Sequence, residues 1–159
     1  MNRNINIAVV GLGQIGIYLY NELNSKKKEI ENKTGKKIEI VAISAKNKNK
    51  KRRFKIDNKI FYSNPLNIFK EKKIDILFEC IGLSDGISKK IAETALKNKV
   101  NVITPNKALI AKHGDNLAKI AEKNNVKPIP ITNPKYTIFL AAIFPYDLFA
   151  KSVIKKAIG

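Results

Sequence analysis

Two short segments of the sequence hold residue types that could do chemistry. Three glycines (Gly11, Gly13, Gly16) with G-x-G-x-x-G spacing directly follow a short apolar run, and a helix-compatible segment comes next. This order of strand, glycine turn and helix is typical of a site for the pyrophosphate of a dinucleotide. Further along, Thr104-Pro105-Asn106-Lys107 follows another apolar run and ends in a lysine. A lysine beside a strand end could stabilise charge that develops on a reacting oxygen.

We expect each glycine of the turn to have its own task. Gly11 permits the tight turn, Gly13 lets backbone amides approach a pyrophosphate, and Gly16 lets the helix pack closely on the strand. The alternative is a glycine turn that binds no ligand, because this spacing also occurs by chance in loops.

Alternating strand and helix patterns must position these segments. The periodicity predicts strands over 5–10, 38–44, 59–62 (weak), 74–81 and 101–104, and helices over 14–33, 66–72, 87–97 and 107–124, the last as one helix or as two separated at Gly114. Thr34-Gly35 should end the first helix. Strands that alternate with helices indicate an α/β fold with a doubly wound parallel sheet, of the Rossmann type.

In such a fold, ligands bind beyond the carboxyl ends of the strands, so four segments should converge there. They are the glycine turn, Ser44–Lys46, Ile81–Ser84 and Thr104–Lys107. We therefore expect cofactor contacts at Gly11, Gly13, Gln14, Ile15, Gly16, Ala45, Lys46, Ile81, Gly82, Thr104, Asn106 and Lys107, with Lys107 also acting in catalysis. The alternatives are that Lys107 is an exposed first-turn residue and that Asn106 caps the helix.

The end of the second predicted strand bears on which dinucleotide binds. An NAD site usually has an acidic residue there for the ribose 2′-hydroxyl. This chain has Ala45, with Lys46, Lys48, Lys50, Lys51, Arg52 and Arg53 close behind. A small neutral residue followed by cations favours NADP, although NAD is possible. The alternative is that these cations are solvated loop charges.

Three other residues could carry chemistry. Glu79 lies in a core strand, where a carboxylate needs a partner, so it either faces the cleft or pairs with a lysine. Cys80 is expected to be a small core residue, and His113 to be structural. With a single cysteine and a single histidine in the chain, we expect no metal site.

The net charge of +18 would suit a nucleic-acid partner, but its composition argues against one. Nearly all the positive charge is lysine, whereas arginine is favoured for phosphate and base recognition. A high content of lysine, asparagine and isoleucine together is typical of proteins encoded by an AT-rich genome. We therefore expect no specific nucleic-acid partner. Without a secretory signal or a long apolar run, we also expect no membrane partner and a cytoplasmic location.

Four segments together resemble one family. IAVVGLGQIG at 7–16, TGKKIEIVAISA at 34–45, FECIG at 78–82 and above all VNVITPNKALIAKHG at 100–114 are similar to the cofactor-binding domain of homoserine dehydrogenase, over roughly residues 5–125. The resemblance implies NAD(P)-dependent interconversion of aspartate semialdehyde and homoserine, on the route to threonine and methionine. It also implies cofactor contacts at the glycine turn and at the Thr-x-Asn-Lys segment, with Lys107 at the active site. One departure is Leu83, where many members have a second glycine.

The resemblance stops near Val126. We expect a dinucleotide-binding domain over 1–126 and a tail over 127–159 without a family counterpart, as in a truncated gene product. The family's substrate domain, which supplies further catalytic groups, is then missing, so small-molecule turnover requires that such a domain be supplied. A non-catalytic Rossmann module for binding or regulation is the alternative. The apolar tail segment 136–149 leads us to expect a homodimer or poor solubility.

Overall fold

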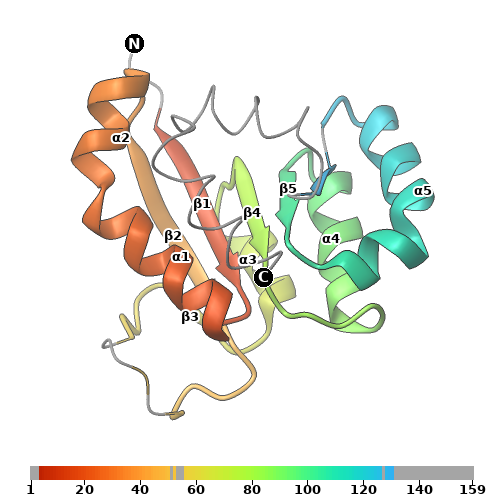
Figure 1. The fold of residues 1–159 in the computed structure, drawn as a ribbon, viewed down its shortest axis with the longest axis horizontal. Coiled ribbons are helices and arrows are strands. Elements are labelled where there is room, and N and C mark those ends of the chain that lie inside the picture. The colour runs from red at the N-terminus through yellow and green to blue at the C-terminus, as the bar shows by residue number, and fades with distance from the viewer. Residues whose placement is uncertain (1–3, 51, 53–55, 127, 131–159) are drawn as a thin grey trace.

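The fold is a parallel sheet that the chain winds outward from its centre in both directions (Figure 1). The computed structural model describes residues 4–50, 52, 56–126 and 128–130. Strand order is β3-β2-β1-β4-β5-β6, and every neighbouring pair is parallel. This is the Rossmann order, with its switch point between β1 and β4. The predicted doubly wound parallel sheet is confirmed.

The first half of the chain forms β1 (Ile5–Val10), α1 (Gln14–Ser25), α2 (Lys27–Thr34), β2 (Ile38–Ser44) and β3 (Phe61–Tyr62). The single helix predicted over 14–33 is wrong, because the backbone of Lys26 leaves the helical region between α1 and α2. Nothing in the local sequence explains this break. Gly35 ends α2 in the left-handed conformation with φ 66°, as its position after Thr34 predicted.

The second half forms the 3-10 turn η1 (Pro65–Asn67), α3 (Ile68–Glu71), β4 (Ile76–Glu79), α4 (Ile87–Lys97), β5 (Asn101–Thr104), α5 (Lys107–Lys123) and β6 (Pro128–Pro130). Of the two alternatives for 107–124, the single helix is confirmed, because Gly114 lies inside α5. β6 extends the sheet beyond the domain boundary predicted at residue 126. Its two prolines suit an edge strand, since proline cannot donate to a central ladder.

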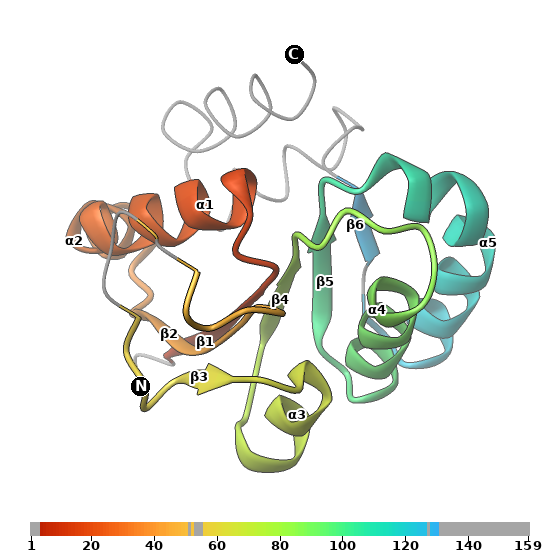
Figure 2. The same cartoon turned by 90° about the horizontal axis from the view of Figure 1, so that it is seen from below.

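Helices cover both faces of the sheet (Figure 2). On one face, Leu19, Leu23 and Ile30 of α1 and α2 pack with the odd-numbered residues of β1, such as Ile7 and Val9. On the other face, side chains of α3, α4 and α5 pack with the even-numbered residues of β1 and with β4 and β5 (Ile68, Ile91, Ala95, Leu109, Leu117, Ala8, Val10, Leu77, Val102). Because both faces are covered, the strands are mostly apolar rather than alternating, with Asn6 in β1 and Glu39 in β2 among the polar exceptions.

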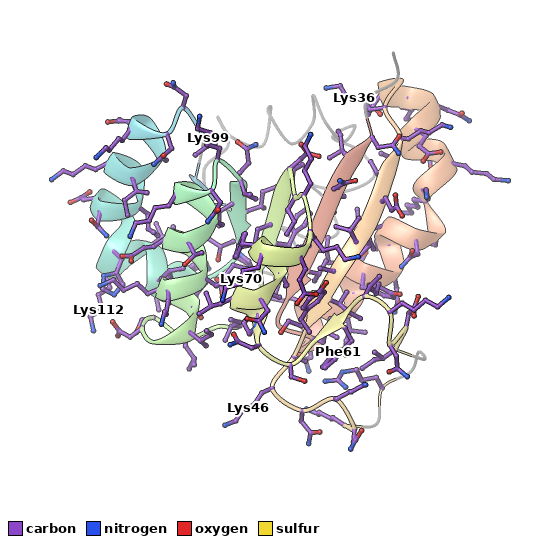
Figure 3. All side chains as sticks on the ribbon, turned by 180° about the vertical axis from the view of Figure 1, so that it is seen from behind. Lys36, Lys46, Phe61, Lys70, Lys99 and Lys112 are labelled. Atoms are coloured by element: carbon purple, nitrogen blue, oxygen red, sulfur yellow. The ribbon has the colours of Figure 1, made fainter. Side chains whose placement is uncertain are left out.

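Within the described residues, no helix is both long enough and apolar enough to cross a membrane. The lysines labelled in Figure 3 lie at both ends of the sheet, with Lys46 and Lys112 at one end and Lys36 and Lys99 at the other. The tail expected at 127–159, apart from β6, lies outside the described residues, as does its apolar segment 136–149.

Candidate functional site

The glycine turn joins β1 to α1 at the switch point of the sheet. Gly11 has φ 96°, and a Cβ atom built on it would lie 2.5 Å from the backbone of Cys80. A Cβ on Gly16 would overlap the carbonyl oxygen of Gly11. Both positions therefore require glycine for backbone reasons, one for the turn and one for close packing of α1. The tasks expected of these two residues match this geometry.

Gly13 differs from its two neighbours in the turn. A Cβ on Gly13 would meet no atom within 4 Å, so the chain itself leaves open space there. Gly13 is also the N-cap of α1, where no side chain caps the helix and no acidic residue occupies the first turn. The first amides of α1 are consequently available to an anion at the positive end of the helix dipole. This arrangement fits the pyrophosphate of a dinucleotide.

A cleft of about 1100 Å³ opens at the carboxyl edge of the sheet, next to this turn. Segments that follow four different strands line it, together with the first residue of α4. The lining residues are Val10–Gly13, Ser44–Lys48, Lys50, Arg52, Ser63–Pro65, Cys80, Ile81, Leu83 and Ile87. Among these described lining residues there is no carboxylate and no histidine.

The loop after β2 forms a basic wall of this cleft. The Arg52 guanidinium donates to three carbonyl oxygens of its own loop, those of Asn47 (2.7 Å), Lys48 (3.1 Å) and Lys50 (3.1 Å). The Lys48 ammonium lies 5.3 Å from the ring centroid of Phe61 in β3. These contacts shape the loop, whereas Lys46 is exposed and points away from it (Figure 3). Lys51 and Arg53 lie outside the described residues.

The loop after β4 forms the opposite wall. Ile81 and Leu83 line the cleft, and Gly82 between them has φ 85°. Leu83 is 56% exposed, which makes it the one large hydrophobic side chain exposed among the described residues. The departure from the family pattern at Leu83 thus lies on the cleft itself.

The Thr104–Lys107 segment turns its first polar side chains inward. Thr104 is buried, and Asn106 is 7% exposed. Asn106 caps α5, because its Oδ1 accepts from the Leu109 amide at 3.0 Å, and its Nδ2 donates to the Leu83 carbonyl at 2.7 Å. Lys107 is the exposed first residue of α5. It is not among the described residues that line the cleft.

Glu79 satisfies neither of the two alternatives predicted for it. It is fully buried at the end of β4 and does not line the cleft, and the groups that donate hydrogen bonds to its carboxylate are hydroxyls and amides rather than a lysine. The prediction failed because those donors come from residues up to 27 positions away, which no local pattern links to Glu79.

A cluster outside the cleft joins the loop after β4 to α5. Asp85 accepts from the Lys112 ammonium at 2.7 Å, from His113 Nε2 at 2.8 Å and from the Ser84 hydroxyl at 2.8 Å. The hydrogen bond from Lys112, followed by those from His113 and Ser84, lowers the pKa of Asp85 well below its usual range. His113 is thus held in an ion-pair network on the surface. Nearby, burial and then the charge of Glu79 raise the pKa of the Cys80 thiol, which makes it a poor nucleophile.

The cleft brings together only part of the predicted site. Of the expected cofactor contacts, Gly11, Gly13, Ala45, Lys46 and Ile81 line it. The cleft is not lined by the other seven, which are Gln14, Ile15, Gly16, Gly82, Thr104, Asn106 and Lys107. The roles of all these residues toward a cofactor, lining or not, stay predictions. The segment 63–65 was missed. The strand order would have indicated it, because β3 ends at the same edge of the sheet as β1 and β2.

A family model, a curated protein and solved structures that are similar to this chain all carry the name homoserine dehydrogenase. A family model described as "Homoserine dehydrogenase, NAD binding domain" matches residues 11–129. The homoserine dehydrogenase of Neisseria gonorrhoeae is 30% identical over 124 residues, which are 78% of this chain and 28% of that protein. The structure of S. aureus homoserine dehydrogenase at pH 7.5 has a TM-score of 0.74 and 26% identity, covering 98% of this chain and 44% of that chain.

A hyperthermophilic archaeal homoserine dehydrogenase mutant, solved in complex with NADPH, shares the fold at a TM-score of 0.62 and 20% identity, covering 78% of this chain and 43% of that one. Compared with the Neisseria gonorrhoeae protein, of which the alignment covers 28%, this chain spans less than a third of the length.

Proposed function

The chain belongs to the homoserine dehydrogenase NAD-binding domain family, and from this premise we propose that its cleft holds a nicotinamide dinucleotide used to interconvert aspartate semialdehyde and homoserine. A bound nicotinamide supplies the hydride chemistry of that reaction. The observation that carries the proposal is the coincidence of the glycine turn, the uncapped N-terminus of α1 and the 1100 Å³ cleft at the switch point. The open space at Gly13 lets the pyrophosphate approach the α1 amides.

We propose NADP as the preferred cofactor. The support is that the wall after β2 presents Ala45 and cations, while no carboxylate is among the described lining residues to accept from a ribose 2′-hydroxyl. Arg52 and Lys48 are engaged with their own loop and with Phe61. Of the two other described lysines that line this wall, Lys46 and Lys50, we assign Lys46 to the 2′-phosphate, because it directly follows Ala45 at the end of β2. The NADPH complex of the archaeal relative is in keeping with this choice.

The test is titration of the purified chain with NADPH and with NADH, with binding monitored by the fluorescence of the cofactor. The Lys46→Gln variant should weaken NADPH binding by roughly fivefold, the order expected for one exposed charge pair, and leave NADH binding unchanged. Lys36→Gln is the matched control, because Lys36 is an exposed lysine at the opposite end of the sheet (Figure 3). Equal losses for NADPH and NADH would refute the assignment of Lys46.

Lys107 is our candidate for the catalytic group that this domain contributes. Its ammonium, exposed at the start of α5 beside the carboxyl edge of the sheet, would hold a substrate oxygen and stabilise the charge developing on it. In an assay with a separate substrate domain supplied, Lys107→Ala should then abolish turnover and leave NADPH affinity nearly unchanged. A loss of affinity as large as the loss of turnover would instead make Lys107 a cofactor-binding residue.

We further propose that this chain alone binds the cofactor without completing the reaction. The support is that the described cleft lining has no carboxylate or histidine that could move a proton. The same observation favours the alternative function, a non-catalytic dinucleotide-binding module. An NADPH-dependent assay with aspartate semialdehyde decides between these proposals. Turnover by the chain alone refutes incompleteness, and turnover only after addition of a separate substrate domain favours the dehydrogenase over the binding module.

A further inference from the structure

Buried polar side chains are concentrated at one point of this fold. Five polar or charged side chains are buried among the described residues, and three of them, Ser88, Thr104 and Asn106, contact a fourth, Glu79. Apart from Ser44, the rest of the described core is apolar. A carboxylate at the centre of this group is costly to bury unless hydrogen bonds satisfy it, so its surroundings are constrained.

The Glu79 carboxylate is satisfied only by groups that donate. Its Oε1 accepts from the Ile81 amide at 2.9 Å and from the Ser88 hydroxyl at 3.0 Å. Its Oε2 accepts from the Thr104 hydroxyl at 2.6 Å and, over a longer contact of 3.5 Å, from the side-chain amide nitrogen Nδ2 of Asn106. One side chain therefore joins the end of β4, the first turn of α4, the end of β5 and the N-cap of α5.

Two of these partners, Ile81 and Asn106, connect the Glu79 carboxylate to the wall of the cleft. Ile81 itself lines the cleft. The Asn106 backbone amide donates to the Thr104 hydroxyl at 3.0 Å, and the Asn106 side chain holds both the Leu83 carbonyl and the Leu109 amide. Leu83 lines the cleft.

We propose that Glu79 is a positioning residue for the cofactor site, acting through Thr104 and Asn106 to fix the loop after β4 and the start of α5. Glu79 touches neither cofactor nor substrate. Instead it orients Ile81 and Leu83 on the cleft wall, and Lys107 at the first position of α5. The inference rests on the proposed function, in that the site it organises is taken to be the dinucleotide site.

The negative charge of Glu79 matters because of its partners. Glutamine keeps the shape of the side chain but replaces one acceptor oxygen with an NH₂ donor. That donor then faces either the Ile81 amide or the Asn106 amide, neither of which can accept. Glu79→Gln should therefore break one side of the network without removing side-chain volume.

The first measurement is amide hydrogen exchange of the full chain without cofactor. In Glu79→Gln, the backbone amide on the side of the network that breaks, that of Ile81 or that of Leu109, should exchange at least about tenfold faster, since both hydrogen bonds depend on the network. The amide of Gly35, bonded to Glu31 at the end of α2, is the internal control and should not change. Unchanged exchange at both Ile81 and Leu109 would overturn the proposal.

The second measurement is the Kd for NADPH, well below the unfolding temperature. We expect Glu79→Gln to raise it by roughly tenfold, the order of one lost hydrogen bond to a charged group. Ile30→Ala, a core truncation in α2 on the other face of the sheet, is the control for a general loss of stability, and should leave Kd within about twofold. Equal effects of the two variants would reduce Glu79 to a structural residue.

Two further outcomes keep the proposals separable. If the wild-type chain binds neither NADPH nor NADH, the proposed function fails, and the exchange measurement still decides the role of Glu79. If Glu79→Gln does not fold, Ser88→Ala removes one donor at 3.0 Å from the same carboxylate. It should accelerate exchange at Ile81 and weaken NADPH binding in the same direction by a smaller factor, and no change in either would overturn the proposal.

Discussion

The two glycines that follow Gly11 in the turn should respond to the same substitution in opposite ways. In Gly16→Ala the new methyl group would overlap the carbonyl oxygen of Gly11 and lie 3.0 Å from its carbonyl carbon. Both atoms belong to the backbone, so the clash is relieved only if α1 moves away from the turn. In Gly13→Ala the methyl group would meet no atom of the chain within 4 Å, and the φ of −80° suits alanine.

Two opposing contributions, helix propensity and overpacking, determine how much Gly16→Ala changes the free energy of unfolding. Alanine gains at most about 1 kcal/mol over glycine from helix propensity. Overpacking typically costs about 1–3 kcal/mol and more where the obstacle is rigid, as the Gly11 backbone is. We therefore expect Gly16→Ala to lower the free energy of unfolding by about 2 kcal/mol. Gly13→Ala should leave the unfolding free energy within about 0.5 kcal/mol of the wild type.

Cofactor binding should separate the variants further. The methyl group of Gly13→Ala occupies the space through which a pyrophosphate would approach the α1 amides, so NADPH affinity should fall although the protein is as stable as the wild type. Urea unfolding gives the free energy of unfolding of each variant, and an NADPH titration on the same preparations gives its cofactor affinity. A Gly16→Ala protein as stable as the wild type, or a Gly13→Ala protein that binds NADPH normally, would refute this assignment of roles.

Three other expectations follow from the hydrogen bonds and burial. The pKa of Asp85 is lowered when folded, so its network adds stability above about pH 4, the unfolded pKa, and loses it as the pH falls toward the folded value. The stability difference between wild type and Asp85→Asn in urea should therefore shrink from pH 7 to pH 3, and a constant difference contradicts the argument. Asn106→Ala should lower the unfolding free energy by about 1–2 kcal/mol, measured by urea unfolding, because it removes the α5 cap and unpairs the Leu83 carbonyl. Because burial raises the pKa of the Cys80 thiol, that residue should react slowly with a thiol reagent at pH 8 and fast in urea. Fast reaction of the folded protein would contradict the raised pKa, because Cys80 lines the open cleft and a reagent can reach it.

Local sequence signals proved reliable wherever neighbouring residues decide the outcome. The apolar run before the glycine turn is β1, Gly35 ends α2, and the limits of α4 and β5 are those predicted. Strand alternation with helices also predicted the doubly wound sheet. These features depend on periodicity, turn residues and chain order, all of which act over a few positions. One exception is the break at Lys26, since the periodic pattern continues across it. Others are the strands predicted over 59–62 and 74–81, which are shorter in the structure as β3 (Phe61–Tyr62) and β4 (Ile76–Glu79).

The amino-acid sequence by itself determined the sheet, the glycine turn and the basic loop that follows β2. Only the tertiary structure decided which side chains meet: that Glu79 is held by hydroxyl and amide donors, that Asn106 joins α5 to Leu83, and that segment 63–65 borders the cleft. The physical reason is that a backbone conformation is chosen mainly by adjacent residues. The partner of a buried polar group is instead chosen by which distant segments the sheet order brings within about 3 Å.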